Sequence, residues 1–197
     1  MRPSNVLDPQ QSGYEELLSL WADLETGLAR LLLTPVHVMS FESKVRGLQS
    51  WMDDLLAKDM DTGLYLLFQL ASTSTAGYSP AHALVCSVLC HVAAAEMRLP
   101  AAERQALVAA AMTMNIAMTQ LQNELAEQEH KPSAQQQEAV RSHAARSCML
   151  LAKLGISNEL WLDVVAAHHE VEAGPDNLAV AEPAQRLAQM LKTIDRY

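Results

Sequence analysis

Apolar side chains recur at every third or fourth position along almost the whole chain, and this pattern limits the fold more than any other feature. Between Tyr14 and Leu33, leucine and tryptophan residues follow this spacing closely. Such a period places apolar side chains on one face of an α-helix, whereas a half-buried strand alternates at every second position. Strong helix formers dominate the composition, and the seven glycines and eight prolines lie mostly between the periodic segments. The sequence therefore predicts an all-α protein.

Turn and capping residues divide the chain into its expected elements. Residues 1–13 are polar and predict a flexible N-terminal arm. Asp61 or Thr62 is expected to cap the third helix, and Ser79 to cap the fourth. Gly155 is expected to end a helix in the left-handed conformation. The expected helices span about 14–33, 40–58, 62–70, 80–97, 101–125, 134–154, 157–169 and 184–197.

Charge and cysteine content exclude several classes of function. The net charge of −9 argues against binding to large nucleic acids, which needs a basic face, although a small nucleotide could still bind in a local pocket. The three cysteines form no CxxC pair, as is typical of a protein in a reducing compartment. The N-terminus has no apolar leader, and no apolar stretch is expected to span a bilayer. We therefore expect a cytoplasmic protein without a membrane partner.

Histidines are the residues with the clearest capacity for chemistry. His82 shares one helical face with Cys86 and Cys90, which follow at one-turn intervals. These side chains could bind zinc, or the cysteines could simply pack in the core, which is the more common role of cysteines on an apolar helix.

The pair His168-His169 is a rarer feature than a single histidine. Adjacent helical side chains point about 100° apart, so both can reach one site only at a helix end or beside a second metal. Glu170 could then orient one imidazole from behind. His143 follows in the middle of an expected helix, and Asp195 ends an apolar run, so that each could face either solvent or a site.

The order of these residues resembles the HD-GYP family, which are cyclic-di-GMP phosphodiesterases of the HD superfamily. The resemblance covers roughly 41–197. The segment 78–82 looks like the family's loop-helix entry with its first histidine, His82, and the triplet 168–170 matches the family's His-His-Glu. His143 resembles the histidine of a later motif, and Asp195 the last metal carboxylate. The resemblance implies an HD-domain-like helical bundle with extra N-terminal helices.

The same resemblance shows where this chain departs from the family. Met114 and Asn115 stand where the family has its His-Asp pair, and Met118 stands where it has a lysine. The resemblance implies two or more metals that activate water, with the aspartate bridging them. A neutral amide is a poor bridge between two dications, and a thioether is too soft for Fe, Mn or Mg. The metal ligands that remain are His82, His143, His168, His169 and Asp195, and they could hold one divalent transition metal (Fe, Mn or Zn) or none.

Three hypotheses follow from this mixture of kept and lost residues. The preferred one is a catalytically degenerate HD-GYP domain in bacterial cyclic-dinucleotide signalling, which binds a cyclic dinucleotide or a signalling protein partner. The second is a metal-dependent phosphohydrolase with a reduced metal site. The third is a metal-free regulatory domain of the related HDOD type. The match of residues 168–170 to the family's His-His-Glu argues against this third hypothesis. Residues 14–70 would cap or extend the core or form a homodimer face, and 71–197 would form the HD-GYP-like domain.

Overall fold

The computed structural model describes residues 9–169 and 180–196, and this part of the chain is helical without strands. The prediction of an all-α fold is therefore confirmed. A short 3-10 helix, η1, spans Pro35–His37 between the first two helices. The α-helices are α1 (Pro9–Leu33), α2 (Phe41–Lys58), α3 (Met60–Thr73), α4 (Tyr78–Glu96), α5 (Ala101–Thr113), α6 (Thr119–Glu127), α7 (Ala134–Arg141), α8 (His143–Lys153), α9 (Glu159–Ala167) and α10 (Pro183–Asp195).

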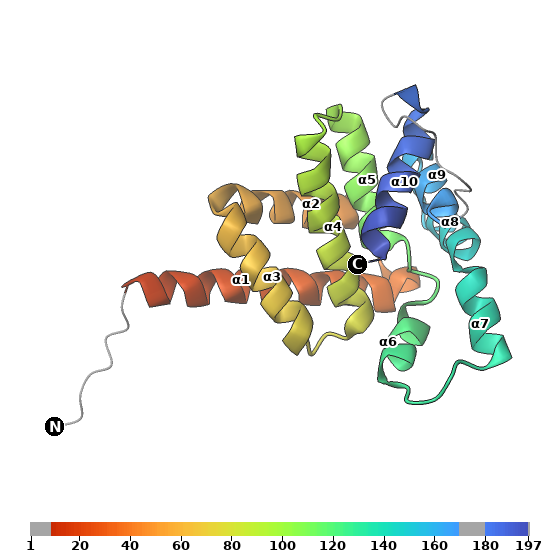
Figure 1. The fold of residues 1–197 in the computed structure, drawn as a ribbon, viewed down its shortest axis with the longest axis horizontal. Coiled ribbons are helices and arrows are strands. Elements are labelled where there is room, and N and C mark those ends of the chain that lie inside the picture. The colour runs from red at the N-terminus through yellow and green to blue at the C-terminus, as the bar shows by residue number, and fades with distance from the viewer. Residues whose placement is uncertain (1–8, 170–179, 197) are drawn as a thin grey trace.

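Helix α4 lies at the centre of the fold. It packs against α5 and α10 on one side and against α1 and α3 on the other, as Figure 1 shows. Its side chains at Leu84, Val88 and Cys90 are almost completely buried. Helix α9 packs against α5, α8 and α10, and α10 also contacts α4 and α5.

The three N-terminal helices share their apolar core with the rest of the chain. Trp21 and Leu24 of α1, Phe41 of α2 and Leu66 of α3 are at most 1% exposed. They belong to the same buried cluster as side chains from α4, α5, α9 and α10. Because large apolar side chains contribute most to the free energy of folding, α1–α3 stabilise the whole described molecule rather than a separate core.

The sequence was expected to contain no apolar stretch long enough to span a bilayer, but α4 meets that requirement by length and composition alone. This helix has 19 residues, and its most apolar window has a mean hydropathy of 1.3, which would suffice to cross a bilayer. However, 56% of that window is buried inside the protein, and core helices pass the same test. The finding is therefore weak support for insertion into a membrane.

Two helices that were predicted to be continuous are each broken in two. The expected helix over 101–125 ends at Thr113 and resumes at Thr119, and the expected helix over 134–154 is interrupted at Ser142. Neither break contains proline or glycine, so the local helix propensity gave no signal of it. Tertiary contacts account for the first break, where the backbone N–H of Ala117 donates to Ser147 Oγ of α8 at 3.2 Å.

Several predicted helix starts also shift. The third helix is capped by Asp59, which accepts the N–H of Thr62 at 3.0 Å, rather than by Asp61 or Thr62. The fourth helix begins after Gly77 rather than Ser79. Helix α1 already begins at Pro9, so residues 9–13 are not part of an arm, while residues 1–8 lie outside the described part. The prediction of a left-handed Gly155 is confirmed by its φ of 88°.

Candidate metal centre

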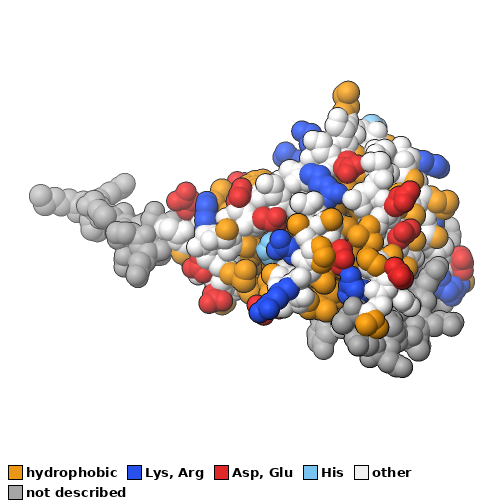
Figure 2. All heavy atoms as spheres, turned by 90° about the horizontal axis from the view of Figure 1, so that it is seen from above, with side chains coloured by type: hydrophobic (Ala, Val, Ile, Leu, Met, Phe, Trp, Pro, Cys, Tyr) orange, Lys and Arg blue, Asp and Glu red, His pale blue; other side chains and the backbone are white. Residues whose placement is uncertain are grey.

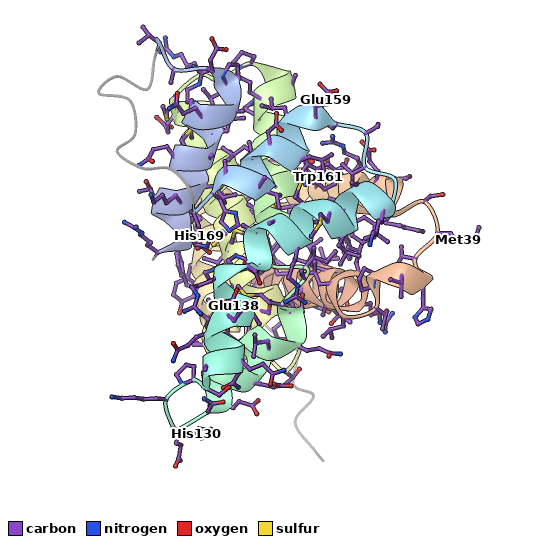
Figure 3. The ribbon with its side chains drawn as sticks, turned by 90° about the vertical axis from the view of Figure 1, so that its right-hand side faces the viewer. Met39, His130, Glu138, Glu159, Trp161 and His169 are labelled. Atoms are coloured by element: carbon purple, nitrogen blue, oxygen red, sulfur yellow. The ribbon has the colours of Figure 1, made fainter. Side chains whose placement is uncertain are left out.

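The site is assembled from helix ends that are far apart in the sequence. His143 is the first residue of α8, because the break at Ser142 places it at a helix start rather than in the middle of a helix as expected. His168 follows the last residue of α9, and His169 comes directly after it. Asp195 is the last residue of α10. Figure 3 labels His169 at the point where the end of α9 approaches α8 and α10.

His143 and His168 face each other with both ring nitrogens defined. Nδ1 of His143 lies 2.6 Å from the carbonyl oxygen of Val140, and Nδ1 of His168 lies 2.7 Å from that of Val165. A carbonyl only accepts, so each Nδ1 carries the proton and donates. The two Nε2 atoms, which lie 3.2 Å apart, therefore direct their lone pairs toward each other.

This facing pair is unfavourable unless a positive charge lies between the two nitrogens. Burial lowers the pKa of His168 to about 4, and burial also lowers the pKa of His143. Both imidazoles are therefore uncharged at neutral pH, with their single proton on Nδ1, and both could bind a metal through Nε2. Two nitrogens bound to one tetrahedral zinc at 2.0–2.1 Å would lie roughly 3.3 Å apart, which matches the observed separation.

His169 completes a group of three imidazoles. The rings of His168 and His169 have centroids 4.2 Å apart, and those of His143 and His169 are 4.9 Å apart. One nitrogen from each of the three side chains lies within 4.8 Å of the others. His168 is the C-terminal cap of α9, so the pair lies at a helix end, which is one of the two positions from which both side chains were expected to reach a site.

Asp195 connects this group to His82. Its Oδ1 lies 2.9 Å from Nε2 of His82, and its Oδ2 lies 3.5 Å from Nε2 of His169. Burial alone would raise the pKa of Asp195, but the hydrogen bond with His82 and the nearby imidazoles hold the pKa below its usual value. The carboxylate is therefore ionised at neutral pH and offers one oxygen to each side.

Cys86 is the member of the site that the ligand set from the sequence did not include. It lies one turn after His82 on α4, and its Sγ is 3.5 Å from Nε2 of His82. His82, Cys86 and Asp195 form a second group of donor atoms within 4.8 Å of one another. The shared helical face of His82 and Cys86 was visible in the sequence, but the arrival of Asp195 from α10 was not.

Met114, Asn115 and Met118, which were expected to replace family residues, lie in the break between α5 and α6. Met114 is fully buried and Asn115 is 6% exposed. The Oδ1 atom of Asn115 is buried and has no hydrogen-bond partner in the described part of the chain, an arrangement that calls for a water or an ion. Met118 is half-buried and lines a cavity with Tyr78 and Gln122 rather than entering either donor group.

Glu170, expected to orient an imidazole, lies outside the described residues. His91, which the sequence left without a partner, has its Nδ1 2.9 Å from Oδ1 of Asp53. The exposed side chains His37 and His130 belong to neither donor group.

No protein-family model, curated protein or solved structure gives a match. The donor set therefore has to be judged by its own chemistry. Three neutral imidazoles suit Zn or Fe better than Mn, which prefers oxygen donors, and the neighbouring group of nitrogen, sulfur and oxygen donors suits a cation that accepts thiolate. The residues thus fit one or two divalent transition metals.

Proposed function

We propose that this protein is a metal-binding, catalytically degenerate domain of HD-GYP type. In this proposal it acts in bacterial cyclic-dinucleotide signalling as a binding or protein-interaction module. The observation that carries the proposal is the lone-pair contact between His143 and His168, with their Nε2 atoms 3.2 Å apart and both Nδ1 protons bound to backbone carbonyls. A packing role alone gives no reason to hold two neutral imidazoles in this way.

Each residue of the site would have a defined role around such a metal. His143, His168 and His169 would hold it, and Asp195 would balance its charge while keeping a hydrogen bond with His82. When bound in an enzyme of this type, the metal activates water and neutralises a phosphodiester. Met114 and Asn115 supply neither an imidazole nor a negative charge in their segment, and this loss supports a binding role over rapid hydrolysis.

A metal-dependent phosphohydrolase with a reduced site is the second candidate. It is favoured by one observation, the second donor group of His82, Cys86 and Asp195 beside the first. Because Asp195 offers one oxygen to His82 and the other to His169, it could take over part of the bridging role that Asn115 cannot fill. This candidate requires turnover, whereas the first requires only binding.

Surface charge is consistent with a small ligand or a protein partner. Figure 2 shows acidic and basic side chains interspersed over the visible face, without a continuous basic area for a large nucleic acid. A cytoplasmic location belongs to the same proposal, since its cyclic-dinucleotide ligand is made inside the cell. A homodimer would be a further way for exposed apolar side chains such as Tyr65 and Phe68 to be covered.

Metal content of the purified protein tests the proposal. We expect at least one transition metal per chain by elemental analysis, lost in the double variant His168→Ala/His169→Ala and kept in the control His130→Ala, whose side chain is exposed and remote from the donors. Absence of metal from wild-type protein that has been loaded and dialysed would overturn the metal-binding role. Cyclic-di-GMP is then added to the loaded protein: binding without turnover favours the first candidate, and turnover favours the second.

A further inference from the structure

A cysteine lies inside the second donor group, and this changes which metal the site would take. We propose that Cys86 is a thiolate ligand, which together with His82 and Asp195 forms a position for zinc or another thiophilic divalent cation. This inference rests on the proposed metal centre but goes beyond it, because it adds a ligand and selects a class of metal. Thiolate favours Zn²⁺ and Co²⁺ over the harder Mn²⁺ and Mg²⁺, which prefer oxygen donors.

The distances fit such a position with little movement. A tetrahedral zinc with bonds of about 2.3 Å to sulfur and 2.0–2.1 Å to nitrogen separates the two donors by roughly 3.6 Å. Cys86 Sγ and His82 Nε2 are 3.5 Å apart. The 2.9 Å between His82 Nε2 and Asp195 Oδ1 is a hydrogen-bond distance, and it would have to lengthen by roughly 0.5 Å on binding.

Neighbouring elements hold the three donors in place. His82 and Cys86 are one turn apart on the rigid central helix α4, and Cys86 is 2% exposed. The ring of Tyr78 stacks on that of His82 with centroids 5.6 Å apart and planes inclined by 9°. Asp195 comes from α10, which packs directly against α4. A metal would therefore meet donors that are already ordered, and little conformational entropy would be lost on binding.

The proton balance of the binding step is simple. A bond forms between the metal and Cys86 Sγ, the thiol proton leaves to solvent, and the metal also replaces the proton on His82 Nε2. The imidazole of His82 keeps one proton, now on Nδ1. No oxidation or reduction takes place.

The site also has an open side. A cavity of about 200 Å³ is bordered by His82 and Cys86 and otherwise by apolar side chains, including Phe68, Val85 and Ile194. Three protein ligands with access to a fourth position is the arrangement of zinc sites that accept a water or a ligand, whereas structural zinc sites are closed by four protein ligands. A metal at Cys86 would therefore be able to exchange a small ligand through this cavity.

Cys90 provides a matched comparison on the same helix. It follows Cys86 by one turn, is fully buried, and lies outside both donor groups. A serine at either position makes the same chemical change in the same helix. Differences between Cys86→Ser and Cys90→Ser therefore report coordination rather than the general effect of replacing a buried thiol.

Cobalt substitution tests the proposal directly. Metal-free protein in a non-coordinating reductant is titrated with Co²⁺, while the near-ultraviolet absorption from thiolate-to-cobalt charge transfer is recorded and bound cobalt is measured by dialysis. We expect the band in wild type and in Cys90→Ser, and its loss in Cys86→Ser. Zinc affinity of the second position should fall by roughly tenfold or more in Cys86→Ser, with a much smaller change for Mn²⁺. Circular dichroism verifies that each variant is folded.

The outcomes separate this inference from the proposed function. Cobalt bound by wild type without a thiolate band, or a band that persists in Cys86→Ser, overturns the role of Cys86 and leaves the three-histidine metal site standing. No bound cobalt at all overturns both. If Cys86→Ser fails to fold, X-ray absorption at the zinc edge of loaded Cys90→Ser protein decides instead. A zinc–sulfur distance of about 2.3 Å supports the role of Cys86, and coordination by nitrogen and oxygen alone overturns it.

Discussion

At the scale of single residues, Asn115 connects the proposed metal centre to a measurable property. Its Oδ1 is buried and has no hydrogen-bond partner among the described residues, so Asn115→Asp would place a negative charge in a buried position. We expect the metal-free variant to be less stable than wild type by on the order of 2 kcal/mol. Added Mn²⁺ or Zn²⁺ should restore much of this loss, because a carboxylate attracts the cation and a neutral amide does not.

Thermal unfolding with chelator and with metal measures this difference. Asn123→Asp serves as the control, since the Asn123 side chain accepts the N–H of Ser79 through Oδ1 at 2.7 Å and an aspartate could keep that bond. Its melting temperature should show no greater response to metal than that of wild type. An Asn115→Asp variant that is equally unstable with and without metal would show that this position does not reach the metal centre.

Glu25 gives the pH dependence expected at the same scale. Burial raises the pKa of its carboxyl above the ordinary 4.5, although a hydrogen bond from Ser74 acts in the opposite direction. Since the folded pKa is the higher one, the stability that the protonated group contributes is complete below the unfolded pKa and is lost as pH rises through the folded pKa. Glu25→Gln, which keeps an acceptor for Ser74, should therefore be more stable than wild type at about pH 7 but not at about pH 4.

Chemical denaturation at several pH values checks this expectation. Glu16→Gln is the matched control, because Glu16 is an exposed residue of the same helix. The free energy of unfolding of Glu25→Gln relative to wild type should grow with pH, and it should grow more than that of Glu16→Gln. A constant difference for Glu25→Gln would mean that its carboxyl titrates alike in the folded and unfolded protein.

Most residues of the candidate site could be predicted from the sequence, because their side chains are of types that bind metals. Taken singly, however, His82, His143, His168, His169 and Asp195 could as well be packing or solvated side chains, and only the resemblance to a family pattern selected them together. The structure brings them into two groups of donor atoms. Cys86 could not be assigned in the same way, because a buried cysteine usually packs as a small apolar side chain. Its contact with His82 and the position of α10 against α4 distinguish it from Cys90.

At the scale of elements, the start of α4 depends on the backbone of Gly77. This residue has a φ of 107°, and a Cβ added there would lie 2.7 Å from Nδ2 of Asn123. We expect Gly77→Ala to lower the free energy of unfolding by more than about 1–2 kcal/mol, since both backbone strain and a steric clash oppose the methyl group. Gly155, with φ of 88° and no atom within 4 Å of an added Cβ, isolates the backbone contribution.

Urea unfolding of both alanine variants separates the two effects. Gly155→Ala should lose about 1 kcal/mol from backbone strain alone, and the excess loss in Gly77→Ala then reports the contact with Asn123. Equal losses in the two variants would show that Asn123 moves aside without cost, and that the turn before α4 is more adaptable than its geometry indicates.

The breaks in the helices show what helical periodicity cannot predict. Residues 114–118 and Ser142 interrupt segments rich in helix-forming residues, and no proline or glycine marks either position. The hydrogen bond from Ala117 to Ser147 joins the first break to α8. Contacts between distant segments decide such breaks, and a local pattern contains no information about them. The break at Ser142 is also what brings His143 to a helix start.

At the scale of the whole molecule, the expected division into N-terminal helices (14–70) and a second domain (71–197) can be tested directly. Buried side chains of α1–α3, including Trp21 and Phe41, belong to the same apolar cluster as those of α4–α10. The sequence pattern could assign each helix an apolar face but could not predict which faces pack together. The same helical periodicity is expected for one shared core and for two separate cores. A shared core predicts that residues 71–197 do not form a stable unit alone.

We therefore expect a fragment of residues 71–197 to lack a cooperative thermal transition. Removing α1–α3 would expose the side of α4 and α5 that these helices cover. Each large apolar side chain that becomes exposed to water would lower the free energy of unfolding by roughly 1.5–3 kcal/mol. Adding the separate fragment of residues 1–70 should restore part of the helical circular dichroism and the transition. A fragment that melts cooperatively by itself would show instead that α1–α3 extend a core that is already complete. In that case its metal content should equal that of the full chain, because all of the donor residues lie between His82 and Asp195.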